Sequence, residues 1–115
     1  MNYRLKGSEF SGGGGGGGSD PIAVDEAYTA VSGDDILADT SGGSFTIDVP
    51  DDGDVGSWFR VTDATDSFAT NPLTIGKNGQ TVMGLGEDMT VSSNGVTLDF
   101  YHNGATWRLR GTPLA

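Results

Sequence analysis

Apolar and polar residues alternate with a period of two along most of the chain from residue 27 onward. Alternation puts every second side chain on the same face of a pleated strand, and these segments are rich in Thr, Val, Ile and aromatic residues. No window of eleven residues has the 3.6-residue period of an amphipathic helix, so almost no helix is expected. Short strands are predicted at residues 27–31, 45–49, 58–62, 73–75, 89–91, 96–100 and 107–109.

Turn-forming residues separate these segments. Asn-Gly pairs occur at residues 78–79, 94–95 and 103–104. Such pairs favour the type I′ turn of a tight hairpin, because both central positions of that turn need positive φ. Together, the alternation and the turns predict an all-β domain over residues 21–115, a small antiparallel β-sandwich or barrel-like knob.

The last two segments are predicted to form a hairpin with one buried face. On the outer face, Asp99 is expected near Arg108 or Arg110, a cross-strand pair of opposite charge that would help to set the register. The residues expected to face the core are Val96, Leu98, Phe100, Trp107 and Leu109.

Seven consecutive glycines, Gly12 to Gly18, separate the patterned body from the N-terminus. This run has no side chains to bury and maximal backbone freedom, so it is interpreted as a linker. The chain is accordingly divided into an extended N-terminal attachment arm (1–11), a polyglycine linker (12–20) and a β-knob domain (21–115). Two alternatives are open: residues 7–10 are also what two joined cloning sites would encode, and several polyglycine segments could pack as polyproline-II-like helices when chains associate.

The charge of the chain argues against several partners. Sixteen acidic and six basic residues give a formal net charge of −10, and residues 20–115 alone carry −11. Nucleic acid is therefore a poor partner, because affinity for phosphates depends on Lys and Arg. No apolar run approaches the roughly 20 residues that span a bilayer, so membrane insertion is not expected. With no cysteine, the chain has no disulfide, thiolate metal site or cysteine nucleophile.

Residues with catalytic or binding chemistry are few. His102, the single histidine, lies beside an Asn-Gly turn, and a role in that turn is favoured over one as general base or metal ligand. The acidic clusters at 34–35 and 51–54 lack the spacing of a calcium loop. The aromatic residues Tyr28, Trp58 and Tyr101 could line a sugar site, although a core or interface position is favoured. No enzymatic activity, cofactor or metal is expected.

Three segments carry a resemblance to a known group of proteins. They are GDDILADTSGGSFTIDVP, FATNPLTI and the closing YHNGATW, and their order is difficult to obtain by chance. Residues 27–109 resemble a small β-module that recurs in bacteriophage tail fibres and virion appendages. The resemblance implies a trimeric, noncatalytic module with a structural or receptor-facing role.

The expected function is that of a structural bacteriophage virion protein, a short homotrimeric decoration or fibre protein at the virion surface. Its arm would dock on other virion proteins of the capsid or tail, with the head slightly favoured. The main alternative is a tail fibre tip that binds glycan on the host surface, and a depolymerase fragment is the third hypothesis. The residues predicted to make the attachment are Tyr3, Arg4, Leu5, Lys6 and Phe10.

Overall fold

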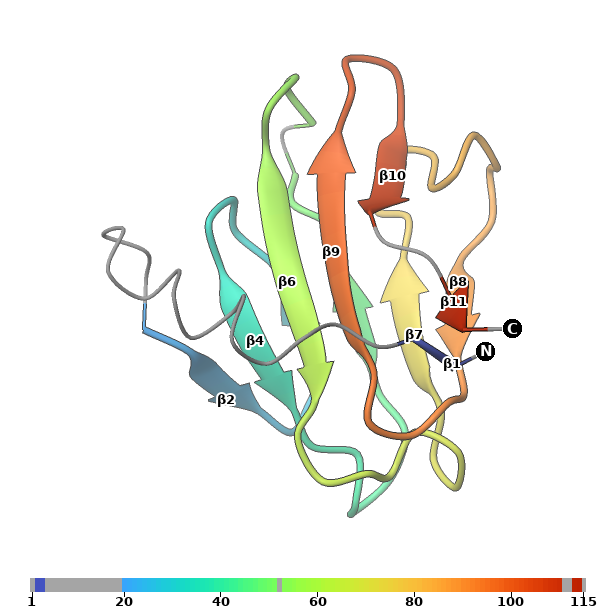
Figure 1. The fold of residues 1–115 in the computed structure, drawn as a ribbon. Coiled ribbons are helices and arrows are strands. Elements are labelled where there is room, and N and C mark those ends of the chain that lie inside the picture. Colours follow the sequence, from blue (N-terminus) through green and yellow to red (C-terminus); the bar gives the residue numbers. More distant parts are fainter. Residues whose placement is uncertain (1, 4–19, 52, 111–112, 115) are drawn as a thin grey trace.

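A computed structural model describes residues 2–3, 20–51, 53–110 and 113–114 of the chain, as strands and connecting loops (Figure 1). The all-β prediction is confirmed for these residues, which contain no helix and therefore none able to cross a membrane. In the described ranges the strands are β1 (Asn2–Tyr3), β2 (Ile22–Val24), β3 (Tyr28–Thr29), β4 (Asp35–Ala38), β5 (Thr46–Asp48), β6 (Trp58–Asp63), β7 (Leu73–Gly76), β8 (Met89–Val91), β9 (Thr97–His102), β10 (Trp107–Arg110) and β11 (Pro113–Leu114).

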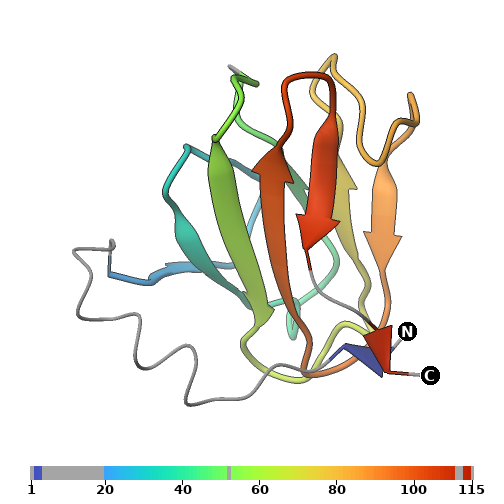
Figure 2. The same ribbon diagram turned by 45° about the horizontal axis from the view of Figure 1, so that its top comes forward.

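Two sheets form the body. One has five strands in the order β10-β9-β6-β4-β2, and the other has four in the order β3-β5-β7-β8. The two layers face each other, with the first in front in Figure 1 and again in the turned view of Figure 2. A separate antiparallel pair, β1 with β11, places the described residues nearest the two chain ends side by side.

The prediction of an antiparallel domain is wrong for half of the body, because both sheets are mixed. From β2 to β7 the chain crosses between the sheets at every step, so each strand pairs in parallel with the strand after next. A parallel pair needs a long crossover, and here a strand of the opposite sheet supplies it. Antiparallel pairing begins only where β7 meets β8 and continues in β6-β9 and β9-β10.

The core lies between the sheets and contains the inward half of each alternating segment. The rings of Phe59 and Phe100 stack with centroids 4.8 Å apart, and Trp107 packs edge-on against Phe59. The inward positions predicted for the C-terminal hairpin are confirmed, with Leu109 only partly buried. The largest fully buried side chains are Trp107, Phe59, Phe68, Phe100, Ile36, Ile47, Leu73, Ile75, Leu98, Val49, Val61 and Val96.

The Asn-Gly pairs differ in what they connect. The pair at 103–104 joins the adjacent strands β9 and β10 in the predicted hairpin. The predicted type I′ turn is wrong there, because the loop has four residues, 103–106, and Gly104 but not Asn103 has positive φ. The pair at 78–79 opens the long connection from β7 to β8, and the pair at 94–95 lies between strands of different sheets. The pattern also missed β2 and β4, because Ile22-Ala23-Val24 and Ile36-Leu37-Ala38 are continuous apolar runs without the alternation that identified the other strands.

Candidate functional site

Two neighbouring rows of outward residues on β6, β9 and β10 carry arginine and aromatic side chains. In the first row, Tyr101 of β9 is opposite both Trp58 of β6 and Arg108 of β10. In the second row, Asp99 of β9 is opposite Arg60 and Arg110. We call these six residues the arginine–aromatic face: Trp58, Arg60, Asp99, Tyr101, Arg108 and Arg110.

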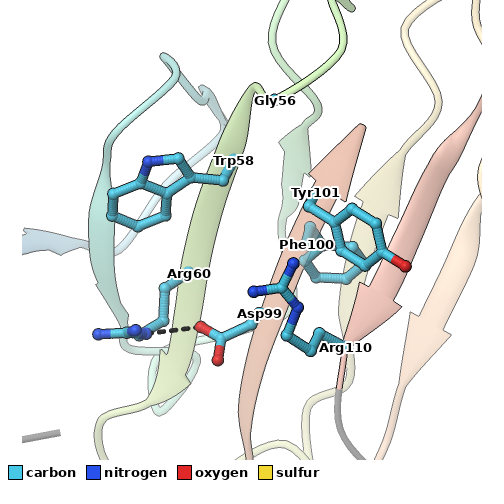
Figure 3. Close-up of a pocket in the computed structure, with 7 residues that line it drawn as sticks. All are labelled: Gly56, Trp58, Arg60, Asp99, Phe100, Tyr101 and Arg110. Atoms are coloured by element: carbon cyan, nitrogen blue, oxygen red, sulfur yellow. Dashed lines mark hydrogen bonds and ion pairs between the residues drawn. The ribbon is translucent and has the colours of Figure 1, made fainter. Parts of the chain in front are cut away.

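The side chains of this face hold one another in place (Figure 3). The Nε atom of Arg60 donates a hydrogen bond to Oδ1 of Asp99 at 2.6 Å. The guanidinium of Arg110 lies over the ring of Tyr101, 4.6 Å from its centroid, in a cation–π contact. Asp99 was expected near Arg108 or Arg110, and its register with Arg110 confirms this, but its ion pair with Arg60 was not predicted.

A hollow of about 370 Å³ opens on this face, lined by Trp58 and Tyr101 together with charged residues of the second row. The Trp58 side chain is 38% exposed, whereas Phe100 between Asp99 and Tyr101 is buried below. Aromatic surface is thus combined with a few placed polar groups, which is the usual composition of a small-molecule site. Such a hollow can bind a ring-shaped ligand that carries polar substituents.

The charge on this side of the sheet is opposite to that of the rest of the body. Residues 20–115 contain four basic side chains, and three of them belong to the arginine–aromatic face. The acidic side chains beside them are Asp99 and Asp35, whose carboxylate is 3.8 Å from Nη1 of Arg60. Burial raises the pKa of Asp35, the Arg60 guanidinium opposes this rise, and the Asp99 carboxylate adds to it.

Of the three aromatic residues singled out in the sequence, the structure brings together Trp58 and Tyr101. Tyr28 lies on β3 in the other sheet, and its hydroxyl donates to Oδ2 of Asp34 at 2.8 Å. That hydrogen bond, with burial and the nearby negative charge, raises the pKa of Tyr28. Tyr28 therefore stabilises the turn before β4 and takes no part in the hollow.

His102 is buried at the end of β9. Its Nδ1 accepts a hydrogen bond from the backbone N–H of Gly104 at 3.0 Å, and its ring packs edge-on against Trp107. These contacts agree with a role in the turn. Within the described ranges, no group of three acidic or histidine side chains is arranged to hold a metal ion.

The buried carboxylate of Asp63 was missed by sequence reasoning. It accepts hydrogen bonds from the backbone N–H groups of Ser67, Phe68 and Gly95 at 3.0–3.2 Å. In the sequence it belongs to a polar stretch that resembles a solvated turn, so no local signal marks it. Its role is to hold two loops together.

The predicted attachment residues lie mostly outside the described residues. The backbone of Tyr3 belongs to β1, whereas Arg4, Leu5, Lys6 and Phe10 fall in the range that the structure does not describe, as do residues 12–19 of the polyglycine linker. The division into arm, linker and knob, and the attachment role of these residues, remain predictions.

No protein-family model matches the sequence, and neither does any curated protein. The function is therefore inferred from the residues and their geometry.

Proposed function

We propose that this protein is a noncatalytic structural module of a bacteriophage virion, a short trimeric decoration or fibre protein at the particle surface. Its N-terminal arm would attach it to capsid or tail proteins, with the head slightly favoured. The observation that supports the proposal is structural: residues in the segments that carry the resemblance stabilise the fold by hydrogen bonding and packing.

Two of the resembling segments meet at the same loop cluster. Oδ1 of Asp39 accepts a hydrogen bond from the backbone N–H of Ser41 at 2.9 Å, which holds the Asp-Thr-Ser-Gly-Gly loop. Hydrogen bonding from the side chain of Ser41, and then from its backbone, lowers the pKa of Asp39. The Nδ2 group of Asn71, from the Asn-Pro-Leu segment, donates to the carbonyl oxygen of Thr40 at 2.8 Å. The two segments are about 30 residues apart in sequence, and this bond explains why both would recur together in one module.

The closing segment divides between the core and the surface. Trp107 is fully buried, and its Nε1 donates to Oε1 of Gln80 at 3.0 Å. Tyr101 instead faces outward on the arginine–aromatic face. The recurring residues of the module are thus mainly structural, and its distinctive surface is an aromatic hollow. Such a module is suited to assembly and binding.

Particle incorporation of an arm deletion tests this proposal. We expect a variant without residues 1–10 to remain folded and trimeric but to be absent from particles, because the body would lack its anchor. The matched variant replaces Tyr3, Leu5 and Phe10 with Ser in the full-length chain, and it should incorporate weakly with an unchanged melting temperature. Incorporation of the deletion variant at normal copy number would show that attachment runs through the acidic body.

The second candidate function is recognition of glycan on a host surface by a tail fibre tip. The hollow between Trp58 and Tyr101 favours this function, because exposed aromatic surface beside polar groups is suited to sugar rings. A glycan-binding assay on the full chain distinguishes it from a purely structural role.

A further inference from the structure

We infer that the arginine–aromatic face binds anionic saccharides, with a sugar ring against Trp58 and its carboxylate or sulfate group held by arginine. This inference deepens the second candidate function and does not depend on attachment to a virion. It rests on three features of the face: its exposed indole, its positioned guanidinium groups and its local charge.

The indole supplies a surface for a sugar ring. Trp58 is 38% exposed at the wall of the hollow, with Tyr101 directly across from it on β9. The C–H groups on one side of a pyranose ring are apolar and stack on aromatic faces, while its hydroxyl groups remain at the rim for polar partners. A hollow of about 370 Å³ is within the size range of small-ligand sites.

The guanidinium groups supply recognition of an anion. The position of Arg110 is restrained by its contact with the Tyr101 ring, and Arg108 is opposite the same tyrosine on β10. A guanidinium presents a planar set of donors that matches carboxylate and sulfate oxygens, so a restrained arginine loses little entropy when it binds one. The neighbouring Asp99 offers acceptors for sugar hydroxyl groups.

Local charge favours an anionic saccharide over a neutral one. The face and Asp35 together carry three arginines and two aspartates, whereas the whole of residues 20–115 carries −11. An acidic loop of a second copy would also match this charge. However, the adjoining outward pair is Thr62 and Thr97, whose hydroxyl oxygens are 3.1 Å apart, so the face lacks the continuous apolar area of a stable subunit interface.

Tryptophan fluorescence can report binding at this face directly. The chain has two tryptophans, and Trp107 is fully buried, so acrylamide should quench mainly Trp58. The full-length protein is titrated with tetragalacturonate, a heparin-derived tetrasaccharide and neutral cellotetraose. We expect both anionic probes to protect Trp58 and to bind roughly tenfold more tightly than cellotetraose, with affinity that falls as salt rises. Tetragalacturonate carries only carboxylates, whereas the heparin fragment carries both carboxylates and sulfates, so tighter binding of the heparin fragment would assign the added affinity to sulfate.

Three variants make the test specific. Trp58→Ala should weaken anionic binding roughly tenfold or more, measured by calorimetry because the indole is removed. Arg110→Gln should reduce anionic affinity to the level of cellotetraose. Lys77→Gln removes the same charge from the loop after β7 and should leave binding unchanged. Each variant is checked by its melting temperature.

Three results would overturn the inference: equal affinity for neutral and anionic probes, no protection of Trp58, or dissociation of an oligomer by Trp58→Ala. The last result would identify this face as a subunit interface. All measurements use purified protein in solution, so they leave the virion proposal to be judged separately by particle incorporation.

Discussion

At the scale of single residues, Asp63 shows how one buried carboxylate organises two loops. Its side chain is 5% exposed, and its oxygens accept backbone hydrogen bonds from the loop after β6 and from Gly95 before β9. A buried carboxylate is costly unless it is well hydrogen-bonded, and these donors meet that requirement. The same bonds satisfy N–H groups that the sheets leave unpaired.

Asp63→Ala should therefore destabilise the protein by roughly 2–4 kcal/mol, because several buried N–H groups lose their acceptor at once. The free energy of unfolding is measured by urea denaturation. Asp54→Ala, at an exposed aspartate, is the control and should change stability by about 0.5 kcal/mol or less. Similar losses in both variants would contradict the organising role of Asp63.

At the scale of elements, the turn after β7 reverses the chain and also bonds it to the segment after β5. Asn78 and Gly79 have φ values of 50° and 74°, as a type I′ turn requires. The Nδ2 group of Asn78 also donates to the carbonyl oxygen of Val49 and to Oδ1 of Asp51, at 3.0 and 2.8 Å. Asparagine is suited to this position because it tolerates positive φ and has a donor to reach the segment after β5.

Two substitutions at Asn78 separate these roles. Asn78→Gly keeps the backbone conformation but loses the hydrogen bonds, so we expect a loss of about 1 kcal/mol. Asn78→Ala loses the bonds and also places a β-carbon at positive φ, so we expect about 2–3 kcal/mol. Thermal and urea unfolding measure both losses. Equal losses would show that the turn conformation contributes nothing.

At the scale of the whole molecule, the edge between β10 and β8 bears on assembly. β10 is an edge strand of the five-stranded sheet and β8 of the four-stranded sheet, and both lie on the same side of the body (Figure 1). The connection between β7 and β8 covers part of this side, with Val82 bridging to Trp107, and it exposes Met83 and Leu85. Backbone groups of Trp107 in β10 bond to Thr81 and Met83 of this connection, so β8 is the edge strand on this side that could pair with another chain. Leu85 is 55% exposed and adds an apolar side chain that another chain could bury.

The proposed function predicts a trimer at micromolar concentration. If this edge is buried between subunits, Leu85→Asp should shift the protein toward monomer, because a charge at that edge would oppose burial. Sedimentation velocity measures both. Val31→Asp is the matched control, since Val31 is 61% exposed in the turn before β4 and should not change the oligomeric state. A monomeric wild-type protein would remove the trimer from the proposed function.

The sequence by itself determined the properties that depend on neighbouring residues, and the tertiary structure decided those that depend on distant ones. The alternation at 96–100 and 107–109 was sufficient to predict the strands and their inward faces, because side-chain direction in a strand depends only on the neighbouring residues. The same alternation is compatible with parallel and antiparallel pairing, so only the tertiary structure decided that β2 to β7 cross between two sheets. Pairing also decided the candidate site: Trp58 meets Tyr101, and Arg60 meets Asp99, because residues about 40 apart in sequence share one sheet. That register results from packing the whole core, which no local pattern encodes.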